Sequence, residues 1–139
     1  MTPIDYDALA REIVAVEGLK TKPYHCTAGK LSIGIGRNLE DRGISEDEAR
    51  YLFKNDEAII ERELDRNVPW WRSLSDGRRR ALINMAFMGV PRLMGFKKML
   101  AALQAGDGQT AAAEARDSKW SHDVQPERVE MVCNLFQEV

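Results

Sequence analysis

Three residues near the N-terminus carry side chains suited to acid–base or nucleophilic chemistry. They are Glu17, Cys26 and Ser32, with eight residues between the first two and five between the last two. A carboxyl group donates or accepts a proton, an ionised thiol is a nucleophile, and a small hydroxyl residue leaves room for a ligand. Each of the three side chains also has a purely structural interpretation, so the elements that position them must be considered.

Glu17 is expected in the last turn of a helix over residues 4–17 that ends at Gly18. The apolar residues of this helix recur at helical spacing: Tyr6, Leu9, Ile13 and Val16. A carboxylate at this end faces the negative pole of the helix dipole and borders the apolar stripe. Both surroundings favour the protonated form that a general acid needs. The alternative interpretation is a solvated surface glutamate.

Residues 20–37 change to the two-residue period of a strand. Apolar Leu31, Ile33 and Ile35 alternate with small Ser32, Gly34 and Gly36. The turn formers Ala28 and Gly29 predict a hairpin, with a third short strand around residues 38–39. A three-residue loop would place Cys26 across from Ser32, and a two-residue loop would place it across from Leu31. The small face of the second strand leaves room for a ligand.

Cys26 has two possible roles. An ordinary thiol, with a pKa of about 8.5, is only slightly ionised at neutral pH. A lone cysteine is most often a small buried residue. Here the neighbouring Lys22, Lys30 and His25 can instead lower the pKa of the thiol and leave it accessible.

The composition is that of a globular protein. Of 139 residues, 44% are hydrophobic and 30% are charged, which excludes a disordered chain. The net charge of −2 argues against nucleic-acid binding, and no apolar stretch is long enough to insert into a membrane. Two cysteines exclude a disulfide scaffold and a cysteine zinc site. We expect no metal and no cofactor.

The remaining elements are predicted to be helical, in an α+β, mainly α fold. Ser45 and Glu48 form a capping box at the start of a long helix that ends near residue 67. Further helices are expected at about 75–88, 92–104, 108–118 and 126–138. Arg78, Arg79 and Arg80 are interpreted as a solvated helix face, and the three tryptophans and Cys133 as packing residues.

At this point the chain resembles the phage-type, T4-like lysozymes of glycoside hydrolase family 24. The spacing of Glu17, Cys26 and Ser32 resembles the catalytic Glu, Asp or Cys, and Thr of that family, in the subset with Cys at the second position. The other matching blocks are Glu17-Gly-Leu, Ser32-Ile-Gly-Ile-Gly36, Ile44-Ser-Glu-Asp-Glu-Ala49, Arg80-Ala-Leu-Ile-Asn-Met-Ala-Phe87, Met94-Gly-Phe96, Lys119-Trp120 and Pro126-Glu-Arg128.

The resemblance implies one lysozyme domain over residues 1–139 with a lysozyme-like two-lobed fold. A hairpin lobe would span about 18–58, and a helical lobe about 67–139. The helix over 4–17 would join the helical lobe.

The resemblance also implies an endolysin-type muramidase, a lysozyme that causes lysis by cleaving the β-1,4 bond between N-acetylmuramic acid and N-acetylglucosamine in bacterial peptidoglycan. Glu17 would be the general acid, Cys26 the nucleophile or water-activating group, and Ser32 would position water. Arg128 would support the general acid.

Two positions are assigned to substrate binding by the same resemblance, Phe87 and Asn38. Arg37 stands where the family commonly has His, so the ion pairing around the hairpin must differ. The protein would be a monomer without a signal peptide, made in the host cytoplasm and released to the cell wall through a holin.

Three alternatives remain at this stage. A cysteine-dependent amidase or peptidase of the wall peptide would use Cys26 with His122 and leave Glu17 without a role. A non-catalytic helical binding module would use Arg78, Arg79 and Arg80. A lytic transglycosylase would cleave the same bond and leave anhydro-muramic ends.

Overall fold

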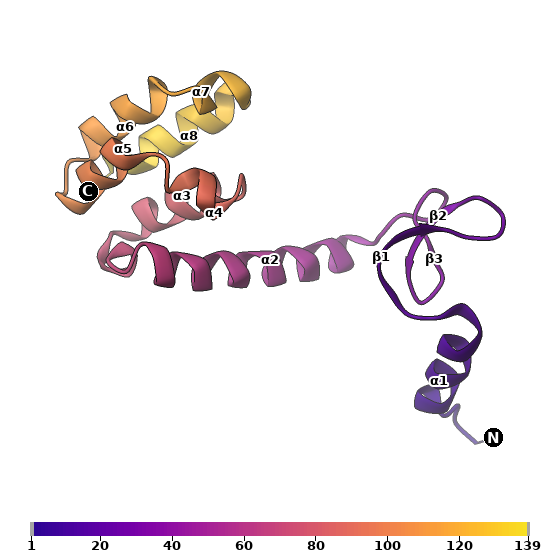
Figure 1. The fold of residues 1–139 in the computed structure, drawn as a ribbon. Coiled ribbons are helices and arrows are strands. Elements are labelled where there is room, and N and C mark those ends of the chain that lie inside the picture. The colour runs from indigo at the N-terminus through magenta and orange to yellow at the C-terminus, as the bar shows by residue number, and fades with distance from the viewer. Residues whose placement is uncertain (1, 139) are drawn as a thin grey trace. The chain divides into compact units, whose positions relative to one another are not determined.

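The computed structural model describes residues 2–138 and divides the chain into two compact units, residues 1–51 and 52–139 (Figure 1). The first unit holds a helix and a three-stranded antiparallel sheet, and the second is helical. This confirms the α+β, mainly α class. That the first helix joins the helical lobe stays a prediction, as do the lobe boundaries at about 18–58 and 67–139.

The first helix, α1, spans Tyr6–Glu17 and ends as the sequence predicts. The Asp5 side chain accepts a hydrogen bond from the Ala8 N–H at 3.0 Å, which caps the helix start. At the other end the Gly18 N–H bonds to the Val14 carbonyl at 2.8 Å. None of the α1 side chains is buried. The helix therefore presents Glu17 at its C-terminus while its apolar stripe is left uncovered by the first unit.

The sheet consists of β1 (Lys20–His25), β2 (Leu31–Gly34) and β3 (Arg37–Asn38), in that order. Tyr24 pairs with Ser32, and His25 pairs with Leu31. Both expected pairings of Cys26 are therefore wrong. The Cys26 N–H bonds to the Lys30 carbonyl at 2.9 Å, which closes a loop of three residues, 27–29. Gly29, with φ +79°, takes the left-handed position that this loop requires.

The long helix α2 spans Glu46–Asn67, and its capping box is confirmed. The Ser45 N–H donates to Glu48 Oε1 at 2.8 Å, and the Glu48 N–H donates to Ser45 Oγ at 3.1 Å. The division between the two units falls within this helix, after Tyr51. Its later turns contribute Ile60 and Leu64 to the core of the second unit.

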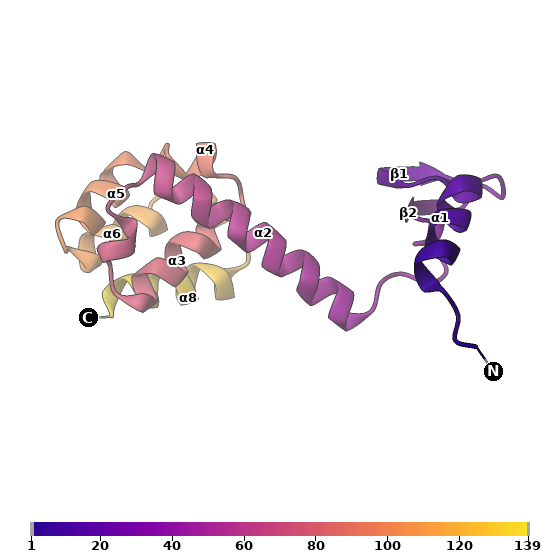
Figure 2. The same ribbon diagram turned by 90° about the horizontal axis from the view of Figure 1, so that it is seen from below.

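The second unit packs its helices around one apolar core (Figure 2). After the 3₁₀ turn η1 (Trp71–Ser73), the helices are α3 (Asp76–Ala86), α4 (Val90–Leu93), α5 (Lys97–Gln104), α6 (Gly108–Arg116), α7 (Trp120–Asp123) and α8 (Pro126–Gln137). The single helix expected over 92–104 is wrong. The segment is interrupted at Gly95, whose N–H bonds back to the Arg92 carbonyl at 3.1 Å and ends the short α4.

Several packing predictions hold in this unit. Trp71, Trp120 and Cys133 are buried, and Trp70 packs against the core. The interpretation of Arg78, Arg79 and Arg80 as a solvated helix face fits only the exposed Arg80. Arg78 and Arg79 are half-buried, and Arg78 Nε donates to the Phe136 carbonyl at the end of α8 at 2.8 Å. Arg80 Nε pairs with Asp76 at 2.7 Å.

Among residues 2–138, no helix combines the length and apolar character needed to cross a membrane.

Candidate active site

The carboxyl group of Glu17 lies against the backbone of Gly36. A Cβ atom on Gly36 would stand 3.1 Å from Glu17 Oε2 and 3.3 Å from its Cγ. Gly36 also has φ +71°, a conformation that residues with a side chain rarely adopt. Of the small residues expected to form a bare strand face, Gly36 contacts Glu17, but it lies in the turn after β2 and not in the strand. Glu17 is exposed, so the partial burial that we expected does not come from residues 2–51.

Cys26 follows β1 and is half-buried at the mouth of the hairpin loop. Hydrogen bonds from the backbone N–H groups of Lys30 and Ala28, together with the Ser32 hydroxyl, lower the pKa of the Cys26 thiol from its ordinary value. The side chain of Lys30 pairs instead with Asp41 at 3.3 Å. The thiolate is therefore favoured by peptide dipoles of the loop, whereas the sequence suggested charged side chains.

Ser32 is buried in β2, with 2% of its surface exposed. Its one hydroxyl hydrogen is donated either to the Lys30 carbonyl, 3.1 Å from Oγ, or to an ionised Cys26 thiol, and the same carbonyl accepts the Cys26 N–H at 2.9 Å. Cys26 and Ser32 are thus brought together through the backbone of Lys30. This arrangement restricts the rotation of the Ser32 hydroxyl and places it beside the thiol.

Asn38 ends β3, and its amide is engaged by the turn that follows. Its Nδ2 donates to Asp41 Oδ2 at 3.0 Å, and its Oδ1 accepts the Asp41 N–H at 3.1 Å. The nearby Glu40 accepts the Leu31 N–H at 2.9 Å, which ties this turn to β2. Asn38 therefore shapes the edge of the sheet, and its role in substrate binding stays a prediction.

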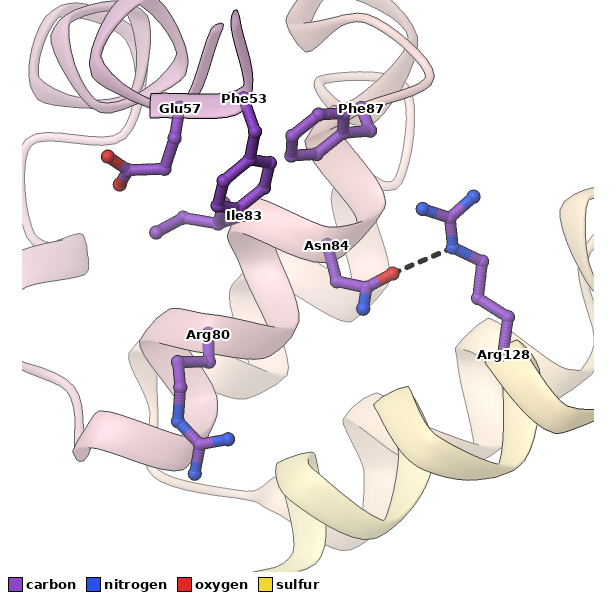
Figure 3. Close-up of a pocket in the computed structure, with 7 residues that line it drawn as sticks. All are labelled: Phe53, Glu57, Arg80, Ile83, Asn84, Phe87 and Arg128. Carbon is purple, nitrogen blue, oxygen red and sulfur yellow. Dashed lines mark hydrogen bonds between the residues drawn. The ribbon is translucent and has the colours of Figure 1, made fainter. Parts of the chain in front are cut away.

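The second unit has a pocket of about 410 Å³ with a largely apolar wall (Figure 3). It is lined by Phe53, Glu57, Arg80, Ile83, Asn84, Phe87 and Arg128. Phe53 of α2 and Phe87, just after α3, stack with ring centroids 5.8 Å apart and planes 8° apart. Arg128 Nε donates to Asn84 Oδ1 at 2.7 Å. Phe87 and Arg128, predicted separately from the sequence, line the same pocket.

Sequence reasoning missed the partners of Phe87 and Arg128 in this pocket. Phe53 and Glu57 are four residues apart on α2, and Ile83 and Phe87 are four apart at the end of α3, a spacing that puts each pair on one helix face. This spacing was visible in the sequence and could have indicated these pocket residues. A hydrogen bond with the neighbouring carboxyl of Glu61 raises the pKa of Glu57, which lines this pocket.

The predicted residues fall in both units. Glu17, Cys26, Ser32 and Asn38 belong to the first, and Phe87, Arg128 and His122 belong to the second. His122 is exposed on α7. Among residues 2–138, no group of three or more His, Cys, Asp or Glu side chains is arranged to hold a metal ion. The chemistry available to the first unit is therefore that of a carboxyl group, a low-pKa thiol and a buried hydroxyl.

Comparison with known families decides the classification, because the Phage lysozyme family model matches residues 14–132. The chain belongs to the phage lysozyme family. This confirms the resemblance inferred from the spacing of Glu17, Cys26 and Ser32, and classes the chain with the lysozyme hydrolases. The match includes all three of these residues as well as Arg128.

Individual relatives agree with the family. The pre-baseplate central spike protein Gp5 of Enterobacteria phage T4 is 32% identical over 133 residues, which cover 75% of this chain and 23% of that protein. Probable T4-type lysozyme 1 of Dictyostelium discoideum is 26% identical in an alignment 151 residues long, which covers 87% of this chain and 88% of that protein. Probable T4-type lysozyme 2 of the same organism is 25% identical over the same shares. The chain thus spans less than a quarter of the spike protein and most of each Dictyostelium protein.

The two cysteines should differ sharply in reactivity. Cys26 should be alkylated by iodoacetamide in the native protein at neutral pH, because loop N–H groups lower its pKa. Cys133 should react only after unfolding, since burial raises its pKa and its Sγ donates to the Ala112 carbonyl. Mass spectrometry of the labelled peptides as a function of pH measures both. Ser32→Ala should shift the Cys26 midpoint to higher pH. A Cys26 midpoint at the ordinary thiol value would contradict the effect of the loop.

Proposed function

We propose that this chain hydrolyses the β-1,4 bond between N-acetylmuramic acid and N-acetylglucosamine in bacterial peptidoglycan, as an endolysin-type muramidase. The observation that carries the proposal is the family match over residues 14–132, which includes the hairpin where Glu17 contacts Gly36 and Cys26 contacts Ser32. The names of the Dictyostelium relatives are consistent with it.

In this proposal Glu17 is the general acid. It donates its proton to the glycosidic oxygen as the bond to the anomeric carbon breaks, and water supplies the group that replaces the leaving sugar. Its position at the C-terminus of α1, directly before the hairpin that carries Cys26 and Ser32, supports this role. The carboxyl group fits against Gly36 because this residue has no side chain, and this contact holds it beside the hairpin.

Cys26 and Ser32 act at the step in which a new group bonds to the anomeric carbon in place of the leaving sugar. A thiolate at Cys26 either attacks the anomeric carbon or removes a proton from the attacking water. In the first route water then breaks the carbon–sulfur bond and releases the thiolate, so two displacements retain the anomeric configuration. In the second route the single displacement by water inverts it. The lowered pKa of Cys26 supports both routes, since each needs the ionised form. Ser32 holds the water, with its hydroxyl placed beside the thiol through Lys30.

The second unit would supply the other wall of the substrate cleft. We propose that α1 packs on the helical unit, that Arg128 then supports the Glu17 carboxyl group, and that Phe87 and Asn38 bind the saccharide. Two observations support the packing: the α1 stripe of Leu9, Ile13 and Val16 is exposed, and the pocket of the second unit has an open apolar wall. Arg128 uses only Nε toward Asn84, and an arginine has five N–H donors.

The proposed enzyme acts as a monomer on the cell wall after holin-dependent release. Peptidoglycan is then its only partner, and no cofactor takes part in the reaction. The chemistry proposed above is consistent with this, since a carboxylic acid, a thiolate and water complete a hydrolysis without a further reagent.

Replacement of the general acid should abolish hydrolysis. Glu17→Gln should lower kcat by about 10²- to 10⁴-fold, because the amide cannot donate a proton to the leaving oxygen. New reducing ends released from purified peptidoglycan measure the activity, and circular dichroism checks that the variant is folded. Glu12→Gln, an exposed substitution on the same helix, is the matched control and should have no effect. New free amines would indicate an amidase instead, and anhydro-muramic ends would indicate a transglycosylase.

Substitutions of Cys26 should show whether activity requires a negative charge at this position or the sulfur atom itself. Cys26→Asp should keep activity within about 10-fold, since a carboxylate accepts the same loop N–H bonds, whereas Cys26→Ala should lose about 10²-fold or more. The anomeric configuration of the first product, followed by NMR, assigns the wild-type route to attack by sulfur or by water. Full activity in Cys26→Ala would remove this residue from the mechanism.

Loss of the arginine should impair the acid without altering the fold. Arg128→Gln should lower activity by about 10-fold or more, as expected for one charge-assisted hydrogen bond. Arg116→Gln is the control, because Arg116 at the end of α6 makes an exposed pair at 3.1 Å with Glu130 of α8, the helix that carries Arg128. Equal activity in the two variants would show that Arg128 does not support Glu17.

A further inference from the structure

An ion pair connects the third strand of the hairpin to the first turn of α2. Arg37 Nη1 donates to Glu48 Oε1 at 2.8 Å, and Arg37 Nη2 lies 2.6 Å from Glu48 Oε2. Nη1 also donates to the Gly43 carbonyl at 3.2 Å. The guanidinium and carboxylate groups therefore meet as two parallel forks, which fixes orientation as well as distance. We call this contact the Arg37–Glu48 brace.

The carboxylate of the brace is itself held by the helix. Glu48 Oε1 accepts the Ser45 N–H at 2.8 Å, and the Glu48 N–H returns a bond to Ser45 Oγ. These contacts, with Arg37 as the largest cause, lower the pKa of Glu48 to about 2. Glu48 thus stays ionised at any pH at which a glycosidase with a carboxylic acid would work, and the brace ends on the backbone of α2.

The other end of the brace lies next to the proposed general acid. Arg37 directly follows Gly36, the residue whose backbone contacts the Glu17 carboxyl group. Gly36 itself lies in the turn between β2 and β3, where its φ of +71° suits a residue without a side chain. The backbone of Arg37 pairs with Ile33 across the turn. The position of Gly36 is therefore set by what holds Arg37.

We propose that Arg37 is a positioning residue: through Glu48 it holds the 36–37 turn at the place where Gly36 orients the carboxyl group of Glu17. The inference rests on the proposed function. Small displacements of a catalytic group cost far more in rate than in stability, because the reacting atoms must be aligned. The Arg37–Glu48 pair is half-buried and bidentate, so its loss also lowers the stability of the fold. The effect on position is therefore measured by kcat and by chemical shifts in folded variants, not by the melting temperature.

The experiment compares four single variants of the full chain on soluble peptidoglycan fragments. Arg37→Gln and Glu48→Gln remove the charge from either end, and Arg37→Lys keeps the charge but loses the fork. Arg50→Gln is the matched control, because Arg50 pairs with Glu46 at 2.9 Å on the same helix without touching the hairpin. We expect both glutamine variants of the brace to lower kcat by about 10-fold or more with KM little changed. Arg37→Lys should recover part of the loss, and Arg50→Gln should match the wild type.

Amide chemical shifts report the same effect without turnover. In Arg37→Gln the signals of Glu17 and Gly36 should move, and in Arg50→Gln they should not. An unchanged kcat in folded Arg37→Gln, or an equal loss in Arg50→Gln, would overturn the proposal. If Arg37→Gln fails to fold, Arg37→Lys is the deciding variant. The proposal would be overturned if Arg37→Lys showed both the wild-type kcat and the wild-type chemical shifts at Glu17 and Gly36. A wild-type protein that releases no reducing ends would refute the proposed function, while the chemical shifts would still test the brace.

Discussion

The contact between a carboxyl group and a bare backbone is the constraint on which the first unit depends. Glu17 occupies space that any side chain on Gly36 would fill, and Gly36 has a positive φ that few other residues tolerate. The helix must end at Gly18 for Glu17 to reach this position, and the turn between β2 and β3 must stay where it is. Since glycine has no side chain of its own to hold the turn, the neighbouring Arg37 is well placed to do so.

The hairpin stabilises an anion at Cys26 through its backbone. The loop after β1 directs the N–H groups of Ala28 and Lys30 toward the Cys26 thiol. Peptide dipoles are fixed by the fold, whereas a lysine side chain must be immobilised at an entropic cost before it can do the same. The Lys30 side chain is correspondingly free to pair with Asp41 at the edge of the sheet. The thiolate thus depends on loop geometry more than on the charges around it.

Prediction from sequence succeeded where the signal is local. The end of α1 at Gly18 and the capping box of Ser45 and Glu48 depend on residues within one helical turn of each other. The predicted register of the hairpin was wrong because register depends on the loop type, and Ala28-Gly29 fits loops of different lengths. The contacts of Arg37 with Glu48 and of Phe53 with Phe87 join residues far apart in the chain, and no spacing rule indicates such partners.

The loop also explains how a thiol can replace a carboxylate at the second position of the proposed site. An aspartate side chain and a cysteine thiolate are both short acceptors, and both can take hydrogen bonds from N–H groups that converge on the start of the loop. Those donors belong to the backbone of Ala28 and Lys30, so they persist whichever residue stands at position 26. The loop therefore selects for an anion of limited length, not for sulfur. On this argument the identity of residue 26 governs the route of the reaction, while the hairpin that receives it is unchanged.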